Sequence, residues 1–316
     1  MKTLLSFIEW EKYILEYKSK EDFKKSLLDL DLDGIEIVRC GEELDIPKEI
    51  IYGIHLPFFT SWVDYYKKDR KRVLEEFGKY SIARNFYTLD YNRLSEYYLK
   101  DLEFSNKYCE YSVFHVANST SLEYLSQKHH LTDKEVIDAS IKLVNEMLDQ
   151  VKINNYFLLE NLYFPGLKFT DVNLTRRLIE KINYDKVGFM LDIGHLLNTN
   201  PDLETEDEGW DYVEKIVDDH REFLDYFKGV HLHVSVSGKV IKDLKENTPL
   251  LCKDFYDRFE QIHNIVKSID THSISTSKKA KKVIEKINPE YLVLEFTSEN
   301  RADREEKIKK QLINLK

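Results

Sequence analysis

Residues 156–160 read Tyr-Phe-Leu-Leu-Glu, an apolar run that ends in a carboxylate. The pattern recurs as Gly-Phe-Met-Leu-Asp at 188–192 and as Tyr-Leu-Val-Leu-Glu at 291–295. Runs that are apolar nearly throughout are typical of parallel strands, because both faces of such strands are buried. A carboxylate that closes a buried strand is costly to desolvate unless it is paired or binds a metal. These segments therefore predict parallel strands that each deliver an acidic group.

Short apolar runs of this kind alternate with longer amphipathic stretches along the whole chain. The alternation predicts parallel strands joined by right-handed helical crossovers. Eight strands favour a single closed (β/α)8 TIM barrel over residues 1–316, with long connections near 60–110 and 235–290 on the active face. A doubly wound open sheet is the alternative, but no GxGxxG motif opens a helix. The predicted strands are Leu4–Ile8, Gly34–Val38, Ile51–His55, Tyr111–His115, Tyr156–Glu160, Val187–Asp192, Gly229–Val234 and Leu292–Phe296.

Charge and cysteine content indicate which kinds of partner the protein binds and in which compartment we expect it. The formal net charge is -10, whereas proteins that grip nucleic acid through its phosphates usually present a basic face. The three cysteines, Cys40, Cys109 and Cys252, form no CxxC pair, so we expect no disulfide framework and a cytoplasmic location. The first ten residues lack a signal-peptide pattern, and no apolar run approaches the ~20 residues that span a membrane.

Histidines and carboxylates cluster at the predicted strand ends. A lone histidine there is usually an ordinary polar residue of the rim, and a lone acid is usually a helix cap. Here the coincidence repeats, and strand ends of a barrel converge on one rim. Imidazole and carboxylate groups suit Zn and Mn, so we expect a divalent-metal site. The residues are His55, His115, Glu160, Asp192, His195, His231, His233 and Glu295, with Asp270 and His272 in the following long connection.

The order of these motifs resembles the xylose isomerase-like TIM-barrel superfamily, which includes endonuclease IV and the tagatose and psicose 3-epimerases. The resemblance runs from the Asp33-Gly-Ile-Glu36 segment to Glu295. Two elements depart from the family pattern: HLHV at 231–234 replaces HLND, and DTHSIST at 270–276 lacks the usual glycine. From the epimerase branch, the resemblance implies one ion on Glu160, Asp192, His231 and Glu295.

From endonuclease IV, the resemblance implies three ions. The first ion is implied on His55, His115 and Glu160. The second is implied on Glu160, Asp192, His231 and Glu295, with Glu160 bridging the two. The third is implied on His195, Asp270 and His272.

Two chemistries fit this ligand set. A phosphoester hydrolase with two or three ions uses all of the ligands. A single-metal sugar isomerase or epimerase uses Glu160 and Glu295 as acid and base. We favour the hydrolase because the ligands outnumber the needs of one ion, and a non-catalytic barrel is the least favoured class. In either case we expect one to three Zn or Mn ions and a small phosphorylated or sugar-like substrate rather than duplex DNA.

Overall fold

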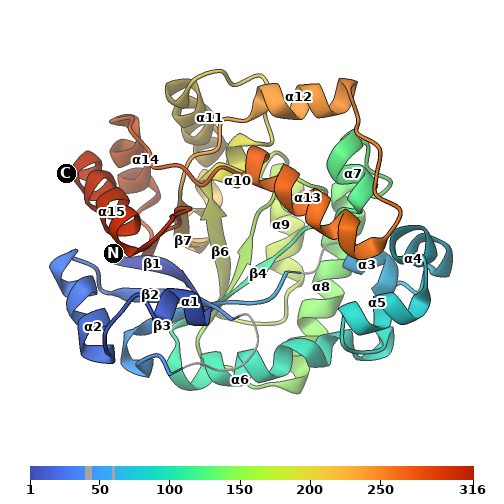
Figure 1. The fold of residues 1–316 in the computed structure, drawn as a ribbon, viewed down its shortest axis with the longest axis horizontal. Helices are drawn as coiled ribbons and strands as arrows, with labels where there is room; N and C mark the ends of the chain where they lie inside the picture. The colour runs from blue at the N-terminus through green and yellow to red at the C-terminus, as the bar shows by residue number, and fades with distance from the viewer. Residues whose placement is uncertain (40–44, 59–60) are drawn as a thin grey trace.

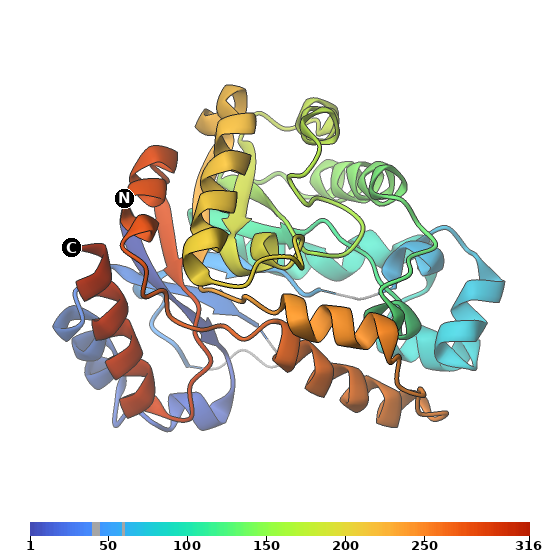
Figure 2. The same ribbon diagram turned by 90° about the horizontal axis from the view of Figure 1, so that it is seen from above.

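Eight parallel strands close into one barrel in the computed structural model, which describes residues 1–39, 45–58 and 61–316. Each strand pairs with the next, and β8 pairs with β1, which confirms the predicted (β/α)8 barrel. Both termini lie on the same side of the molecule in the two views (Figures 1 and 2). The strands are β1 (Lys2–Ile8), β2 (Gly34–Val38), β3 (Ile51–His55), β4 (Tyr111–His115), β5 (Tyr156–Glu160), β6 (Val187–Asp192), β7 (Phe227–Leu232) and β8 (Tyr291–Leu294).

The predicted bounds of β2 to β6 are those observed. β1 begins at Lys2 instead of Leu4, β7 begins at Phe227 instead of Gly229, and β8 begins at Tyr291 instead of Leu292. The last two strands also end before their predicted ends. β7 was expected to end at Val234 and ends at Leu232, because Val234 pairs in antiparallel fashion with Ser273 instead of continuing the parallel ladder. The backbone N–H of Val234 donates to the carbonyl of Ser273 at 2.8 Å. β8 ends at Leu294, so Glu295 follows the strand rather than lying within it.

Helices surround the barrel, and both long connections are built largely from them (Figure 1). The α-helices are α1 (Glu11–Ile14), α2 (Lys20–Asp29), α3 (Trp62–Tyr66), α4 (Arg70–Phe77), α5 (Tyr80–Phe86), α6 (Leu99–Tyr108), α7 (Ser121–Ser126), α8 (Asp133–Gln150), α9 (Val172–Lys181), α10 (Ile193–Leu197), α11 (Glu206–Asp219), α12 (Gly238–Glu246), α13 (Phe255–Ile269), α14 (Lys279–Ile287) and α15 (Arg301–Leu315). Short 3-10 helices are η1 (Lys48–Ile50), η2 (Tyr91–Tyr98) and η3 (Arg221–Tyr226).

Helix α8 shows how the sequence specifies these elements. Thr132 accepts a hydrogen bond from the backbone N–H of Glu135, and the Glu135 carboxylate accepts one from the N–H of Thr132. This capping box satisfies two backbone donors that the first turn leaves free. Val136, Leu143 and Met147 recur at helical spacing and are fully buried against the barrel. The helix is thus fixed by its cap at one end and by one apolar face along its length.

Alternation along the strands places the candidate ligands inside the barrel. Leu158 of β5 belongs to an apolar plug that fills the interior, and Glu160, two residues later, faces the same way. The plug ends where the strands end, so the next inward position lies on the rim. The same step of two residues leads from Val113 to His115, from Met190 to Asp192 and from Val293 to Glu295.

The 235–290 connection packs beside this rim. Helices α12 and α13 lie against α7, as Figure 1 shows. Their buried contacts include Tyr124, Phe164, Ile241 and Ile262, which form an apolar cluster separate from the main core. The long connection is therefore a packed layer beside the rim.

The expectations about disulfides and membrane-spanning segments can be compared with the structure over the described residues. Cys109 and Cys252 are free thiols, and Cys40 lies outside the described residues. Within the described ranges, none of the helices combines the length and the apolar character needed to cross a membrane.

Candidate metal centre

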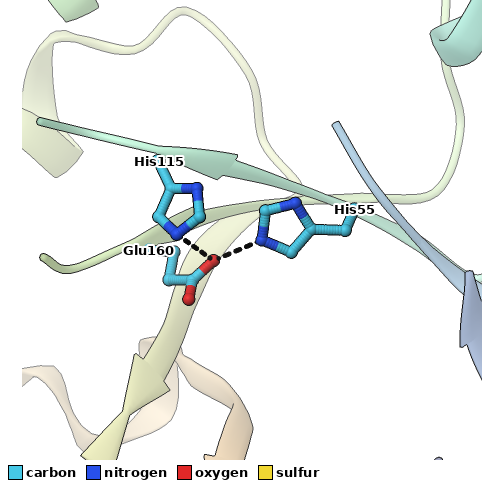
Figure 3. A group of neighbouring side chains, drawn as sticks. All are labelled: His55, His115 and Glu160. Atoms are coloured by element: carbon cyan, nitrogen blue, oxygen red, sulfur yellow. Dashed lines mark hydrogen bonds and ion pairs between the residues drawn. The ribbon is translucent and has the colours of Figure 1, made fainter. Parts of the chain in front are cut away.

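Glu160, at the end of β5, stands at the centre of the site. Its Oε2 atom lies 2.9 Å from Nε2 of His55 and 3.3 Å from Nε2 of His115. Figure 3 shows both imidazoles directed at this one oxygen. The strands set this arrangement, because His115 pairs with Glu160 in the β4–β5 register and His55 pairs with Val113 across β3 and β4. The three side chains of the implied first ion therefore meet in space.

The other oxygen of Glu160 faces a second group of ligands. Oε1 lies 3.0 Å from Nδ1 of His231, and that nitrogen is also 3.7 Å from Asp192 Oδ2 and 3.3 Å from Glu295 Oε2. Asp192 and His231 are paired across β6 and β7. Three carboxylates of the implied second ion thus surround one nitrogen of the fourth residue, His231.

The implied third set gathers around Asp270. Its Oδ2 atom lies 3.1 Å from Nε2 of His195 and 2.9 Å from Nε2 of His272. The antiparallel bridge between Val234 and Ser273 holds the 270–273 segment against the end of β7. His272 adopts a left-handed backbone with φ 46, a region in which histidine is commoner than most other residues. This turn brings Asp270 and His272 to the rim from a distant part of the chain.

The imidazoles are oriented as metal ligands are. In four of them one nitrogen faces the cluster, and the other is held by an oxygen outside it. A carbonyl or carboxylate oxygen only accepts, so the held nitrogen carries a proton, and the inward nitrogen is the one that could bind an ion once its own proton is lost, as in metal-binding histidines. The held pairs are His55 Nδ1 with Leu56 O (2.9 Å), His195 Nδ1 with Asn161 O (3.0 Å), His231 Nε2 with Glu36 Oε1 (3.1 Å) and His272 Nδ1 with Glu295 O (3.3 Å).

Unpartnered buried atoms give an independent test of whether a metal fits. Both ring nitrogens of His115 and Oε2 of Glu295 have no hydrogen-bond partner among the described residues. Each of these atoms belongs to a residue of one of the implied sets. His115 Nε2 and Glu295 Oε2 make ion-pair contacts at 3.3 Å with Glu160 and His231, but buried polar atoms that make no hydrogen bond are unfavourable. Groups of nitrogen and oxygen donors within 4.8 Å of one another occur here, among them His55, His115 and Glu160, and also Glu160, Asp192 and His231. These residues fit a divalent ion such as zinc.

Comparison with known proteins supports the fold. No family model matches the chain, and no curated protein matches it in sequence. Endonuclease IV from Thermus thermophilus has a TM-score of 0.56 at 12% identity and covers 100% of this chain and 99% of its own. The IolI protein with a bound zinc atom has a TM-score of 0.55 at 13% identity, covering 99% of this chain and 96% of its own. A D-tagatose 3-epimerase-like protein has a TM-score of 0.51 at 15% identity, covering 100% and 98%.

The chain has the same barrel fold as these structures. The resemblance predicted from the sequence is confirmed at that level. Similarity at such low identity concerns the fold alone, and the matched structures bear the names of both an endonuclease and epimerases. The function of this barrel must therefore be argued from its site.

Electrostatics at the site follow from burial among opposite charges. Burial opposes protonation of His55, but the carboxylates of Glu160 and Glu36 outweigh it and raise the pKa of His55 to about 9. Burial likewise opposes protonation of His195, and Asp192 and Asp270 raise its pKa to about 10. Burial would raise the pKa of Glu160, yet the surrounding histidines lower that pKa well below its usual value. Without ions, protonated imidazoles thus compensate the buried carboxylates.

Two residues of the site were not in the predicted ligand sets. Glu36 of β2 is fully buried and contacts Nε2 of His231. His233, just past β7, is also fully buried and lies 3.0 Å from Asp192 Oδ2. Glu36 could have been found from the sequence because it is a charged residue within an otherwise apolar strand. For His233 the signal was its spacing of two from His231, since residues two apart face the same side.

Access to the site is narrow. Glu160 is 1% exposed, whereas the side chains of Glu295 and His272 are each 21% exposed and that of His115 is 12% exposed. Two aromatic rings border the cluster: Phe58 lies 4.8 Å from the His115 ring, and Tyr163 lies 6.0 Å from the His195 ring. Solvent therefore reaches the cluster on the side of Glu295, His272 and His115.

Proposed function

We propose that this protein is a phosphoester hydrolase that uses two or three divalent ions, Zn or Mn. The observation that carries the proposal is the placement of the two carboxylate oxygens of Glu160. One oxygen faces His55 and His115, and the other faces His231. A carboxylate with a different group of ligands at each of its two oxygens suits a bridge between two ions. A single ion needs only one of these two ligand groups.

Each group of ligands has its own role in the proposed hydrolase. Neighbouring divalent ions activate water, neutralise a phosphoryl group and stabilise the leaving oxygen. Glu160 sets the spacing of the two ligand groups, and Asp192 and His231 complete the second group from adjacent strands. Glu295 is the most exposed ligand of the second group, so it lies on the side from which a small phosphorylated substrate approaches. His195, Asp270 and His272 supply the third group.

Metal analysis of the purified protein tests this proposal. We expect two to three ions per chain and turnover of small phosphoesters. His115→Ala should remove one ion and nearly all turnover, because His115 belongs only to the first ligand group. His263→Ala is the matched control, since His263 is exposed on α13. A single ion per chain, with full retention of that ion in His115→Ala, would reject the multi-metal hydrolase.

A single-metal isomerase or epimerase of sugars is the second candidate. It is favoured by the approach of both Glu160 and Glu295 to Nδ1 of His231, at 3.0 and 3.3 Å, which leaves two carboxylates beside one ion position. In this chemistry Glu160 and Glu295 would exchange a proton with the substrate as acid and base. One Mn or Co ion should then suffice, and His115→Ala should mainly change substrate affinity.

A further inference from the structure

His233 lies between two of the candidate ion sites. It belongs to neither ligand set that the family resemblance implies, although its ring lies within 4.8 Å of donor atoms of Asp192 and His195 and also of Asp270 and His272. Its Nε2 atom is 3.0 Å from Oδ2 of Asp192, a ligand of the implied second ion. Its Nδ1 atom is 3.8 Å from Oδ1 of Asp270, a ligand of the implied third ion. The residue is completely buried. One imidazole therefore faces the carboxylates of two different sites.

The ring of His233 is held by close packing. It stacks on His272 with ring centroids 4.0 Å apart and an interplanar angle of 8°. It also lies against Gly194, where a Cβ atom would come within 2.0 Å of Cε1 of His233. Any larger residue at 194 would displace the ring, so the glycine in the Asp-Ile-Gly-His segment makes the room that His233 occupies.

The stacking with His272 argues against His233 as a further ligand of the third ion. An imidazole binds a metal through a lone pair in its ring plane, at about 2.0–2.1 Å for zinc. Two nearly parallel rings about 4 Å apart have no common in-plane point at that distance. In this arrangement, Nε2 of His233 instead carries a proton that it donates to Asp192.

Ser235 completes the connection to the third site. Its hydroxyl donates to Oδ1 of Asp270 at 3.1 Å and lies 3.4 Å from Nδ1 of His233. The backbone N–H of Thr271 donates to the same hydroxyl at 2.9 Å. A continuous buried chain of polar contacts thus runs from Asp192 through His233 and Ser235 to Asp270.

We propose that His233 is a positioning residue that couples the second and third ion sites, an inference that rests on the multi-metal function proposed above. By holding Asp192 and bordering Asp270, it fixes one carboxylate of each site relative to the other. Substitution of a residue that orients a metal ligand, without itself binding the metal, typically changes metal affinity by about 10- to 100-fold. Loss of His233 should therefore weaken two ion-binding steps and spare the step at His55, His115 and Glu160.

Three variants separate the role of the ring nitrogens from that of packing. His233→Leu removes both nitrogens. His233→Gln restores an N–H donor near the position of Nε2. Gly194→Ala crowds the His233 ring without substituting any of the ligands. His263→Leu, at an exposed histidine of α13, is the control.

Titration of the metal-free proteins with Co²⁺ against a competing chelator, followed by absorption and elemental analysis, is the measurement. We expect His233→Leu and Gly194→Ala to weaken two binding steps by about 10-fold or more, and His233→Gln to recover part of the loss. Should His233→Leu not fold, His233→Gln and Gly194→Ala carry the same test.

Two results would overturn the coupling role. Unchanged binding steps in Gly194→Ala and His233→Leu would show that His233 positions neither site. Complete loss of one ion, with the others unaffected, would make His233 a direct ligand. A wild-type protein that binds fewer than two ions would instead reject the proposed function, so the two failures are distinguishable.

Discussion

The Nε2 atom of His231 lies 3.1 Å from Oε1 of Glu36, while Nδ1 of the same ring lies 3.0 Å from Oε1 of Glu160. Glu36 thus fixes both the tautomer and the direction of a candidate ligand, as carboxylates behind metal-bound histidines commonly do. Glu36→Gln should weaken binding of the second ion by about 10- to 100-fold, measured by chelator competition. Glu285→Gln, at an exposed site on α14, should have no effect. Equal affinities in the two variants would contradict this role for Glu36.

Substitution of Glu160 and substitution of Glu295 should affect the binding of different ions. Glu160→Gln should lower the content of both the first and the second ion and reduce turnover by more than about 100-fold, because its two oxygens face both ligand groups. Glu295→Gln should leave the first ion in place, since the carboxylate of Glu295 approaches His231 of the second group. Elemental analysis beside turnover of a phosphoester checks both. If Glu160→Gln kept its full metal content, the bridging role would be wrong.

Much of the barrel could be predicted because its strands carry a local signal. The run Tyr156–Glu160 is apolar up to the residue at which the chain leaves the barrel, and β5 has these bounds. The ends of β7 and β8 lacked such a signal. Val234 is apolar and continues the pattern, yet it pairs with Ser273, a partner that becomes visible only in three dimensions.

The candidate site was predictable where a polar residue ends a strand and less so where it does not. Glu36 stands between two isoleucines within β2, and only its complete burial beneath His231 shows its task. The place of His233 depends on the irregular register between β6 and β7 at Phe189 and Met190 and on the space beside Gly194. No spacing in the sequence encodes those two relations.

Metal uptake should depend steeply on pH. The pKa values of His55, His195 and His272 are raised to about 9, 10 and 9 in the metal-free protein, whereas a bound ion requires neutral imidazoles. Each ion therefore displaces protons, and affinity should rise between about pH 6 and about pH 9. Calorimetry in buffers of different ionisation enthalpy measures the proton release. Affinity that is flat over this range would contradict the raised pKa values.

The same groups determine how the stability of the metal-free protein changes with pH. Their folded-state pKa values lie above the unfolded value of about 6.5. Their contribution to the free energy of unfolding is therefore fully present below about pH 6.5 and is lost as the pH rises through about 9 to 10. Urea unfolding in the presence of a chelator should show this alkaline loss. Saturating zinc should remove it, because ions then replace the protons.

Binding to DNA should be weak at physiological salt. Phosphate contacts dominate such affinity, and this chain carries a formal net charge of -10. Its basic segment at residues 67–72 is partly neutralised, since Arg72 lies 3.2 Å and Lys71 lies 3.8 Å from the carboxylate of Glu75. Fluorescence anisotropy with a duplex that carries an abasic site, at about 50 mM and about 200 mM salt, tests this expectation. We expect little binding at the higher salt, together with turnover of small phosphoesters. Tight binding that weakens steeply with salt, accompanied by cleavage at the abasic site, would instead make this barrel a repair nuclease, with the same ions acting on a larger substrate.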